Sequence, residues 1–274
     1  MAILSIDLAF RRWSDLGIVV LDRAASTDVE GESTSPISCE IIPSKLPGDE
    51  PGPVDANILA GRLNHLCGVR GIRIILLDGP QAWKSRHNGL QHARVSERQL
   101  NTAAKTGLPG MVKPITYRAF AEFSVDVYDA LCRRGWRRLE THDQPASPTD
   151  CMQDRILVES YPHAAWKSLG LKPLPSKRRA RVSDLAAAYH ALNSLIPITT
   201  SRSPNHDQLQ AIVGGLPGLA LAGLALPGLA LNDPNAAGAR IVGNPPRREE
   251  GHWREGFIVL PLPPARSVPL RWIR

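Results

Sequence analysis

The sequence is poor in cysteine, and none of its four cysteines forms a C-x-x-C pair. This absence argues against zinc-binding and dithiol redox motifs, which use such pairs. It also predicts reduced thiols in a cytoplasmic protein, because structural disulfides are typical of oxidising compartments. No signal peptide is expected at the front of the chain, since Asp7 and the Arg11-Arg12 pair interrupt the first apolar run too early.

A second absence is that of charge between Leu209 and Leu231, a stretch long enough to span a bilayer. The stretch contains five glycines and two prolines, and it repeats the sequence Leu-Pro-Gly-Leu-Ala-Leu at positions 216 and 226. Helix-breaking residues at this density favour broken, packed helical segments over a membrane span. We therefore expect no membrane partner.

Acidic residues are fewer than basic ones, 26 against 33, and the formal net charge is +7. A positive surface of this kind suits a polyanionic partner, here DNA or RNA. Basic side chains are the usual phosphate contacts in such complexes. For any single basic run, a solvated surface is the alternative interpretation. The predicted nucleic-acid-binding residues are Lys84, Arg86, Arg94, Arg98, Lys177 and Arg178.

Apolar periodicity predicts three strands joined by short links, which favours an antiparallel meander. These strands cover residues 2–7, 16–21 and 37–42. Helical spacing follows, with a side formed by Ile58, Leu59, Leu63 and Leu66, and then a buried central strand at residues 72–77. Further helices are expected at 119–134, 164–169, 182–195 and from Asp207, and further strands at 136–140, 156–160 and 257–260.

This order of elements fits an RNase H-like α/β fold, a mixed sheet of three antiparallel strands and then parallel strands, flanked by helices. A doubly wound Rossmann sheet would need a helix after the first strand and a G-x-G-x-x-G turn, and the sequence has neither. We expect a single domain over residues 1–274. It would carry a basic insertion at about 79–113 above the site and a Gly/Pro-rich helical segment at about 209–231.

Four carboxylates stand at the ends of these predicted elements. Asp7, Asp78 and Glu159 close predicted strands, and Asp207 opens a predicted helix. A carboxylate at the end of a buried strand is costly unless something pairs with it. In a sheet of this order the first strand lies beside the following parallel strand, so Asp7 and Asp78 are expected to be close. Like charges brought together raise each other's pKa, and a bound metal relieves this repulsion.

Carboxylate oxygens are the hard ligands that Mg²⁺ and Mn²⁺ prefer. Two such ions about 4 Å apart activate water and stabilise the leaving oxygen in phosphodiester cleavage. We therefore predict that Asp7, Asp78, Glu159 and Asp207 are the metal ligands and the catalytic residues of a metal-dependent nuclease. Each also has a structural alternative. Asp7 and Asp78 could belong to turns, Glu159 could pair with an arginine, and Asp207 could cap its helix.

At these residues the chain resembles the predicted RNase H-like nuclease family that is filed as domain of unknown function 429. The resemblance implies an RNase H-like fold, with the four carboxylates as candidate metal ligands and with Arg94 and Glu97 near the site. The matching pieces run in family order: Ser5-Ile-Asp7-Leu-Ala9, Leu76-Leu-Asp78-Gly-Pro80, Arg94-Val-Ser-Glu97-Arg98, Val158-Glu159-Ser-Tyr-Pro162, His206-Asp207-Gln-Leu-Gln-Ala211 and Glu255-Gly-Phe-Ile-Val-Leu-Pro261.

One position departs from the family pattern. The family often has a second aspartate in the late helix, where this chain has Gln210, one turn after Asp207. An amide carries no charge, so a second interpretation is a catalytically impaired, RNase H-like nucleic-acid-binding protein. A third, an actin-like or sugar-kinase-like phosphotransferase, ranks last because Leu8-Ala9-Phe10 offers no glycine or hydroxyl for phosphates.

Overall fold

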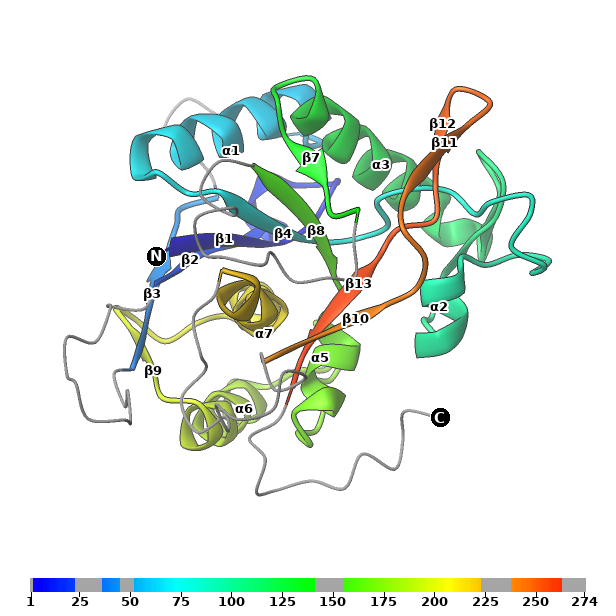
Figure 1. The fold of residues 1–274 in the computed structure, drawn as a ribbon. Helices are drawn as coiled ribbons and strands as arrows, with labels where there is room; N and C mark the ends of the chain where they lie inside the picture. Colours follow the sequence, from blue (N-terminus) through cyan, green and yellow to red (C-terminus); the bar gives the residue numbers. More distant parts are fainter. Residues whose placement is uncertain (1, 23–35, 45–51, 141–154, 223–237, 263–274) are drawn as a thin grey trace.

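The computed structural model describes residues 2–22, 36–44, 52–140, 155–222 and 238–262 (Figure 1). A mixed sheet of nine strands forms its centre, in the order β10-β13-β8-β4-β1-β2-β3-β9, with β7 paired to β8. The strands are β1 (Ala2–Asp7), β2 (Gly17–Asp22), β3 (Ile37–Ile41), β4 (Ile74–Asp78), β7 (Arg137–Arg138), β8 (Ile156–Ser160), β9 (Ile198–Thr200), β10 (Ala239–Val242) and β13 (Ile258–Pro261).

The first three strands form the predicted antiparallel meander, and the next ones run parallel. Strand β2 is antiparallel to both β1 and β3, whereas β4 lies parallel beside β1 and β8 lies parallel beside β4. The sequence reflects these environments. In β3 buried and exposed side chains alternate, while the first four residues of β4 are all buried because helices cover both faces of the sheet there. The predicted strand arrangement is therefore confirmed.

Helices cover both faces of this sheet (Figure 1). On one face lie α1 (Ala56–Arg70) and α3 (Arg118–Cys132), and on the other lie α5 (Pro162–Ser168), α6 (Val182–Leu195) and α7 (His206–Leu221). The predicted side of α1 is wrong at one position. Leu59 and Leu63 are buried, but Ile58 is 53% exposed. Since Leu59, Leu63 and Cys67 repeat every four residues, they form the stripe against the sheet, and Ile58 lies beside it.

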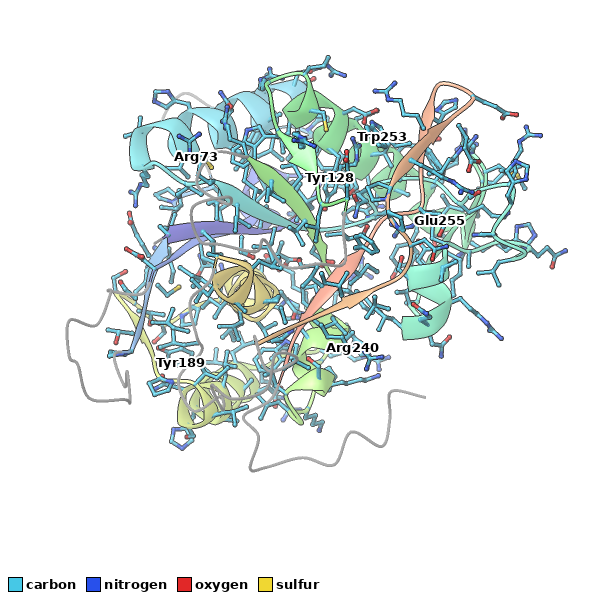
Figure 2. All side chains as sticks on the ribbon, in the orientation of Figure 1. Arg73, Tyr128, Tyr189, Arg240, Trp253 and Glu255 are labelled. Atoms are coloured by element: carbon cyan, nitrogen blue, oxygen red, sulfur yellow. The ribbon has the colours of Figure 1, made fainter. Side chains whose placement is uncertain are left out.

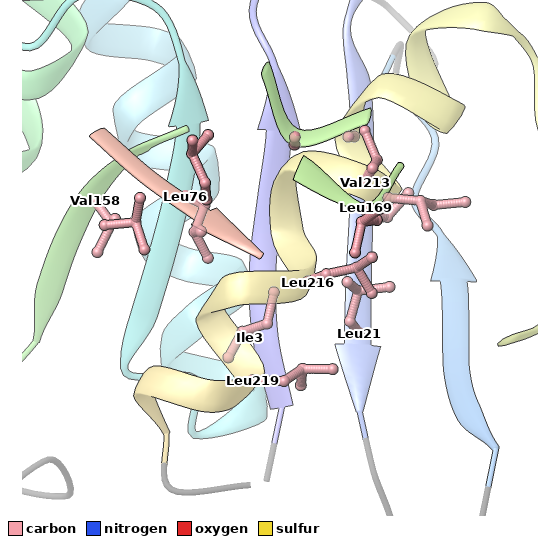
Figure 3. Packing of buried hydrophobic residues seen from close by; sticks show 14 of the residues in the cluster. Ile3, Leu21, Leu76, Val158, Leu169, Val213, Leu216 and Leu219 are labelled. Carbon is pink, nitrogen blue, oxygen red and sulfur yellow. The ribbon is translucent and has the colours of Figure 1, made fainter. Parts of the chain in front are cut away.

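Helix α7 is one continuous helix, although broken segments were expected from its glycines and proline. It runs through Pro217 and is buried along most of its length. Its glycines allow a close approach to the sheet, because a Cβ atom at Gly215 or Gly218 would lie 2.7 Å from Ser5 Cβ or 2.3 Å from Leu76 Cδ1. Figure 3 shows Leu216 and Leu219 packed on these strands. The second half of the predicted Gly/Pro-rich segment, residues 223–231, lies outside the described residues.

Among the described residues, no helix is both long enough and apolar enough to cross a bilayer. Of the four cysteines, Cys39, Cys67 and Cys132 are free thiols, and Cys151 lies outside the described residues.

The region at residues 79–113 contains short elements that periodicity did not predict. They are α2 (Val95–Leu100), β5 (Lys105–Thr106) and β6 (Val112–Lys113). The region lies beside the hairpin of β11 (Arg247–Glu249) and β12 (His252–Arg254) in Figure 1. Glu255, labelled in Figure 2, joins the two, because its carboxylate accepts hydrogen bonds from the backbone N–H groups of Ser85 and Val95, each at 2.8 Å. The late-sequence hairpin thus supports the region that borders the site described next.

Candidate active site

Asp7 and Asp78 meet at the carboxyl ends of adjacent parallel strands. They are the last residues of β1 and β4 and stand directly opposite each other in the strand register. Register partners in a sheet point to the same face, so the two side chains lie together. Both are partly buried, and their carboxyl groups hydrogen-bond to each other. The structure therefore brings together the two aspartates that the sequence analysis paired.

The environment of this aspartate pair disfavours two negative charges. Burial, followed by repulsion from Asp78 and Asp207, raises the pKa of Asp7 well above its usual range, and Lys177 only partly opposes this. Burial likewise raises the pKa of Asp78 to about 7. Two carboxyl groups this close titrate as a unit and retain a shared proton near neutral pH. The pair is thus suited to exchange its proton for a cation.

Asp207 lies in the first turn of α7 and approaches the aspartate pair from the neighbouring helix. It is 5% exposed, and its charge contributes to the raised pKa of Asp7. Asp207 does not cap α7, as the structural alternative would require. The N-cap is Asn205, whose side chain accepts a hydrogen bond from the backbone N–H of Gln208 at 2.9 Å. Instead, the Asp207 carboxylate pairs with the ammonium group of Lys177, which also bonds Asp15 at 2.9 Å.

Gly17 makes this approach possible, and the sequence analysis missed it. It begins β2 directly opposite Asp7. A Cβ atom at this position would lie 2.2 Å from the backbone oxygen of Asp207, so any larger residue would push the start of α7 away. The local signal is only a glycine in front of an apolar run, which also occurs at ordinary strand starts. Nothing near Gly17 in the sequence indicates that a helix beginning at residue 206 packs there.

The register of β8 turns Glu159 to the other face of the sheet, although its charge still helps to raise the pKa of Asp78. It stands opposite Leu77, whereas Ser160 stands opposite Asp78. Side chains alternate along a strand, so a shift of one residue reverses the face. The Glu159 carboxylate receives two hydrogen bonds from the Arg94 guanidinium, at 2.6 and 2.7 Å, and one from the Gln81 backbone N–H at 3.0 Å. The structural alternative, an arginine partner, is the arrangement observed.

Arg94, Glu97 and Glu159 form a buried ionic network. Arg94 is 1% exposed and also bonds Glu97, whose carboxylate accepts the hydroxyl and the backbone N–H of Thr106. Burial by itself would lower the pKa of Arg94, but Glu159 and Glu97 raise it above its ordinary value. The guanidinium is therefore held as a cation inside the protein. This placement favours a structural role for Arg94 over a contact with phosphate.

The other predicted nucleic-acid-binding residues divide by exposure. Lys84 is buried, and its ammonium group donates to the Ser85 carbonyl at 2.7 Å. Arg86 is exposed and lies 3.1 Å from Glu250. Arg98 and Arg178 are exposed, and Lys177 is about half exposed beside Asp207. Exposed side chains are accessible to a polyanion. Four of the predicted residues could therefore contact nucleic acid: Arg86, Arg98, Lys177 and Arg178.

Gln210 is not directed into the site. Its side-chain oxygen accepts a hydrogen bond from the Trp166 indole at 2.8 Å, which ties α7 to α5. The amide therefore has a packing role at the position where the resembled family often has an aspartate.

A divalent ion fits the aspartate pair better than the full set of four carboxylates. Within the described ranges, no three Asp, Glu, His or Cys side chains are arranged to hold a metal together. Mg²⁺, however, is commonly bound by only one or two carboxylates, with water and substrate phosphate as its other ligands. The donor chemistry and the raised pKa values of Asp7 and Asp78 suit such a cation.

The strand order and register match the arrangement expected for an RNase H-like α/β fold, with three antiparallel strands followed by parallel strands in a mixed sheet flanked by helices. No protein-family model matches the chain, and no curated protein matches it either. Among solved structures it is similar to Thermus thermophilus RuvC, with 13% identity over 83% of this chain and 99% of that chain and a TM-score of 0.35. It is also similar to T. thermophilus RuvC in complex with Holliday junction substrate, with 11% identity, the same coverage and a TM-score of 0.34.

At these TM-scores the similarity carries no argument about function. The fold class therefore rests on the strands themselves, and the relationship to the family of domain of unknown function 429 stays a prediction.

Proposed function

We propose that this protein is a divalent-metal-dependent nuclease that hydrolyses phosphodiester bonds in DNA or RNA. The observation that carries the proposal is the in-register pair of Asp7 and Asp78, two partly buried carboxyl groups at the ends of adjacent parallel strands. Their mutual repulsion favours a cation between them. The resemblance to the family of domain of unknown function 429 supports the same activity.

Asp7 and Asp78 would hold Mg²⁺ or Mn²⁺, with Asp207 beside them. When bound, such an ion activates water and neutralises the charge that develops on the phosphate in hydrolysis. Asp207 contributes a further negative charge at this end of the sheet. Gly17 fixes its distance from Asp7 by letting the start of α7 lie directly against β2.

The remaining predicted residues act around this centre. Glu159 has a positioning role, because its carboxylate holds Arg94 and the Gln81 backbone next to the site. Exposed basic side chains at Arg86, Arg98 and Arg178 would contact the phosphates of the nucleic acid. The formal charge of +7 favours the approach of such a polyanion.

A second candidate is a nucleic-acid-binding protein that does not cleave. Two side chains near the predicted site favour this candidate, because each is hydrogen-bonded to another residue. Glu159 accepts hydrogen bonds from Arg94, and Gln210 accepts one from Trp166. In that case the basic surface would bind nucleic acid while the aspartate pair stays without catalytic function.

The deciding experiment measures cleavage of labelled single-stranded, duplex and branched DNA and RNA with Mg²⁺, with Mn²⁺ or with a chelator. The variants are Asp7→Asn and Asp78→Asn, with Asp55→Asn as the matched control. Asp55 caps α1 away from the site, and asparagine caps a helix equally well. We expect metal-dependent cleavage by the wild type and the control, and only background cleavage by the other two variants.

Three results would have distinct meanings. Cleavage that persists equally in every variant would point to a contaminating nuclease and contradict the proposed site. An absence of cleavage together with salt-sensitive binding would favour the second candidate. Loss of cleavage in the control as well would mean that the effect is not specific to the aspartate pair.

A further inference from the structure

A cavity of about 380 Å³ lies against Asp78, at the end of β4. Its volume falls within the range of about 300–1,000 Å³ that is common for small-ligand sites. Ser160 and Tyr161 line it from the end of β8, and residues 101–104 line it from the region after α2. Tyr161 forms a hydrogen bond with the backbone of Ala103, so the two walls are tied together. The two segments that line the cavity are therefore held in place relative to each other.

The lining of this cavity includes the rings of one phenylalanine and two tyrosines. Tyr117 and Phe120 come from the start of α3, and Tyr161 follows β8. Asn101 and Thr102 add an amide and a hydroxyl group. Aromatic faces for stacking, together with a few hydrogen-bonding side chains, are how proteins recognise the bases of single-stranded nucleic acid.

The charges in the lining argue against a phosphate group inside the cavity. Arg94 lines it, but its guanidinium is neutralised by Glu97 and Glu159. Burial and the nearby Lys167 lower the pKa of His163, so this ring is neutral at pH 7. Among the described lining residues, Arg94 and His163 are the only basic side chains. A nucleotide would consequently place its uncharged base inside and its phosphate outside.

We propose that this cavity binds an unpaired nucleobase and thereby places the adjoining phosphodiester beside Asp7 and Asp78. The inference rests on the proposed nuclease function and names its substrate class. Asp78 belongs to both sites, because it lines the cavity and pairs with Asp7. A base within an intact duplex is stacked and paired and cannot enter, so the substrate is a strand with an unpaired base.

The test measures binding of a single-stranded oligonucleotide that contains the fluorescent base 2-aminopurine, in a chelator so that no cleavage occurs. Ala103→Trp would fill the cavity from an exposed loop position, and Tyr161→Leu would remove one aromatic face. Val182→Trp is the matched control, because Val182 is 84% exposed on α6 and does not line the cavity. Circular dichroism and thermal unfolding would establish that each variant is folded.

We expect the wild type and the control to quench 2-aminopurine equally. The two cavity variants should bind the strand roughly 5- to 100-fold more weakly, the cost of losing one base–aromatic stack. A fully paired duplex with the same label should show no quenching. Free nucleoside monophosphates provide a further arm, since their binding with the same loss in the variants would show that the cavity takes a base without its strand.

Unchanged strand binding in both cavity variants would overturn the inference. So would equal quenching of the paired duplex. Neither result would touch the proposed nuclease function, because that function is tested separately by metal-dependent cleavage and the Asp7→Asn variant. Conversely, intact base binding in a protein that cleaves nothing would retain the cavity as a nucleobase site and reject the nuclease.

Discussion

Two acidic groups lie at the same end of the sheet, and the protein treats them in opposite ways. Burial raises the pKa of all three carboxyl groups, but Asp7 and Asp78 face each other, whereas Glu159 faces a buried arginine that donates to both of its oxygens and partly opposes the raised pKa. A single step in strand register separates the two arrangements, since Asp78 stands opposite Ser160 and Leu77 stands opposite Glu159. The comparison teaches that proximity of carboxylates in a fold does not make them one site.

The two regions also differ in what they contribute. In the network of Arg94, Glu97 and Glu159, the buried charges are compensated by opposite charges and hydrogen bonds, so the network holds neighbouring segments in place. In the aspartate pair, no buried arginine of the described residues offsets the burial, so the pair weakens the folded state at neutral pH, and a cation bound as proposed would relieve this. The first region supports the structure, and the second is suited to function.

The largest expected effect comes from breaking the network. Arg94→Met removes the cation and leaves Glu97 and Glu159 buried without their guanidinium partner. Breaking a buried ion pair in this way costs about 3–5 kcal/mol of unfolding free energy. Urea unfolding at neutral pH measures it. Arg118→Met is the control, because its ion pair with Glu122 is exposed and contributes at most about 1 kcal/mol. Equal losses in both variants would contradict the distinction between the regions.

A smaller effect of opposite sign is expected at the aspartate pair. The folded pKa of Asp78 is about 7, above the ordinary value near 4, so the folded protein retains a proton that the unfolded chain loses. This contribution to stability is complete below about pH 4 and is lost as the pH rises through about 7. Asparagine stays neutral at every pH. The change in unfolding free energy that Asp78→Asn causes should therefore be more favourable at about pH 8 than at about pH 4, by roughly 1–3 kcal/mol.

Thermal unfolding of the wild type and Asp78→Asn between about pH 4 and pH 8 checks this prediction. The decisive quantity is how the stability difference between the variant and the wild type changes with pH. A difference that stays the same at every pH would only reflect the replacement of an oxygen by an amide nitrogen. A difference that shrinks with rising pH would contradict the raised pKa. Asp55→Asn, at the N-cap of α1, is the matched control for the exchange itself.

The smallest effect is expected at Lys177, whose ammonium group pairs with Asp207 in the first turn of α7. It pairs with Asp207 and Asp15 and opposes the raised pKa of Asp7, but it is about half exposed. Lys177→Met should therefore change the stability by less than about 1 kcal/mol. Removing its charge should strengthen Mn²⁺ binding by roughly fivefold, the effect of about 1 kcal/mol of repulsion.

Isothermal titration calorimetry at low salt would measure this affinity. Lys172→Met removes another exposed lysine, in the loop after α5, so it controls for net charge. Weaker or unchanged binding after Lys177→Met would show that this lysine does not compete with the cation. Equal strengthening in the control would assign the effect to the overall charge of the protein.

Much of the fold could be predicted from local patterns. The apolar runs that end in Asp7 and Asp78 are strands, the three-strand meander is present, and α6 covers the residues that its spacing predicted. The short elements were missed, among them β9 and β11, because three residues are too few to show a period. Ile58 was placed on the wrong side of α1, since sequence spacing alone leaves the edge of a helix stripe undetermined.

The sequence by itself determined that Asp7 and Asp78 end buried strands, because an apolar run followed by a carboxylate is visible locally. Only the tertiary structure decided that Glu159 turns to the other face of the sheet and pairs with Arg94. Strand β8 is buried on both faces and shows no polar alternation, so its register against β4 cannot be read from its residues. The partner of Glu159 lies 65 residues away, and Gly17 meets a helix that begins near residue 206. Such contacts depend on how the whole chain packs, which no local pattern encodes.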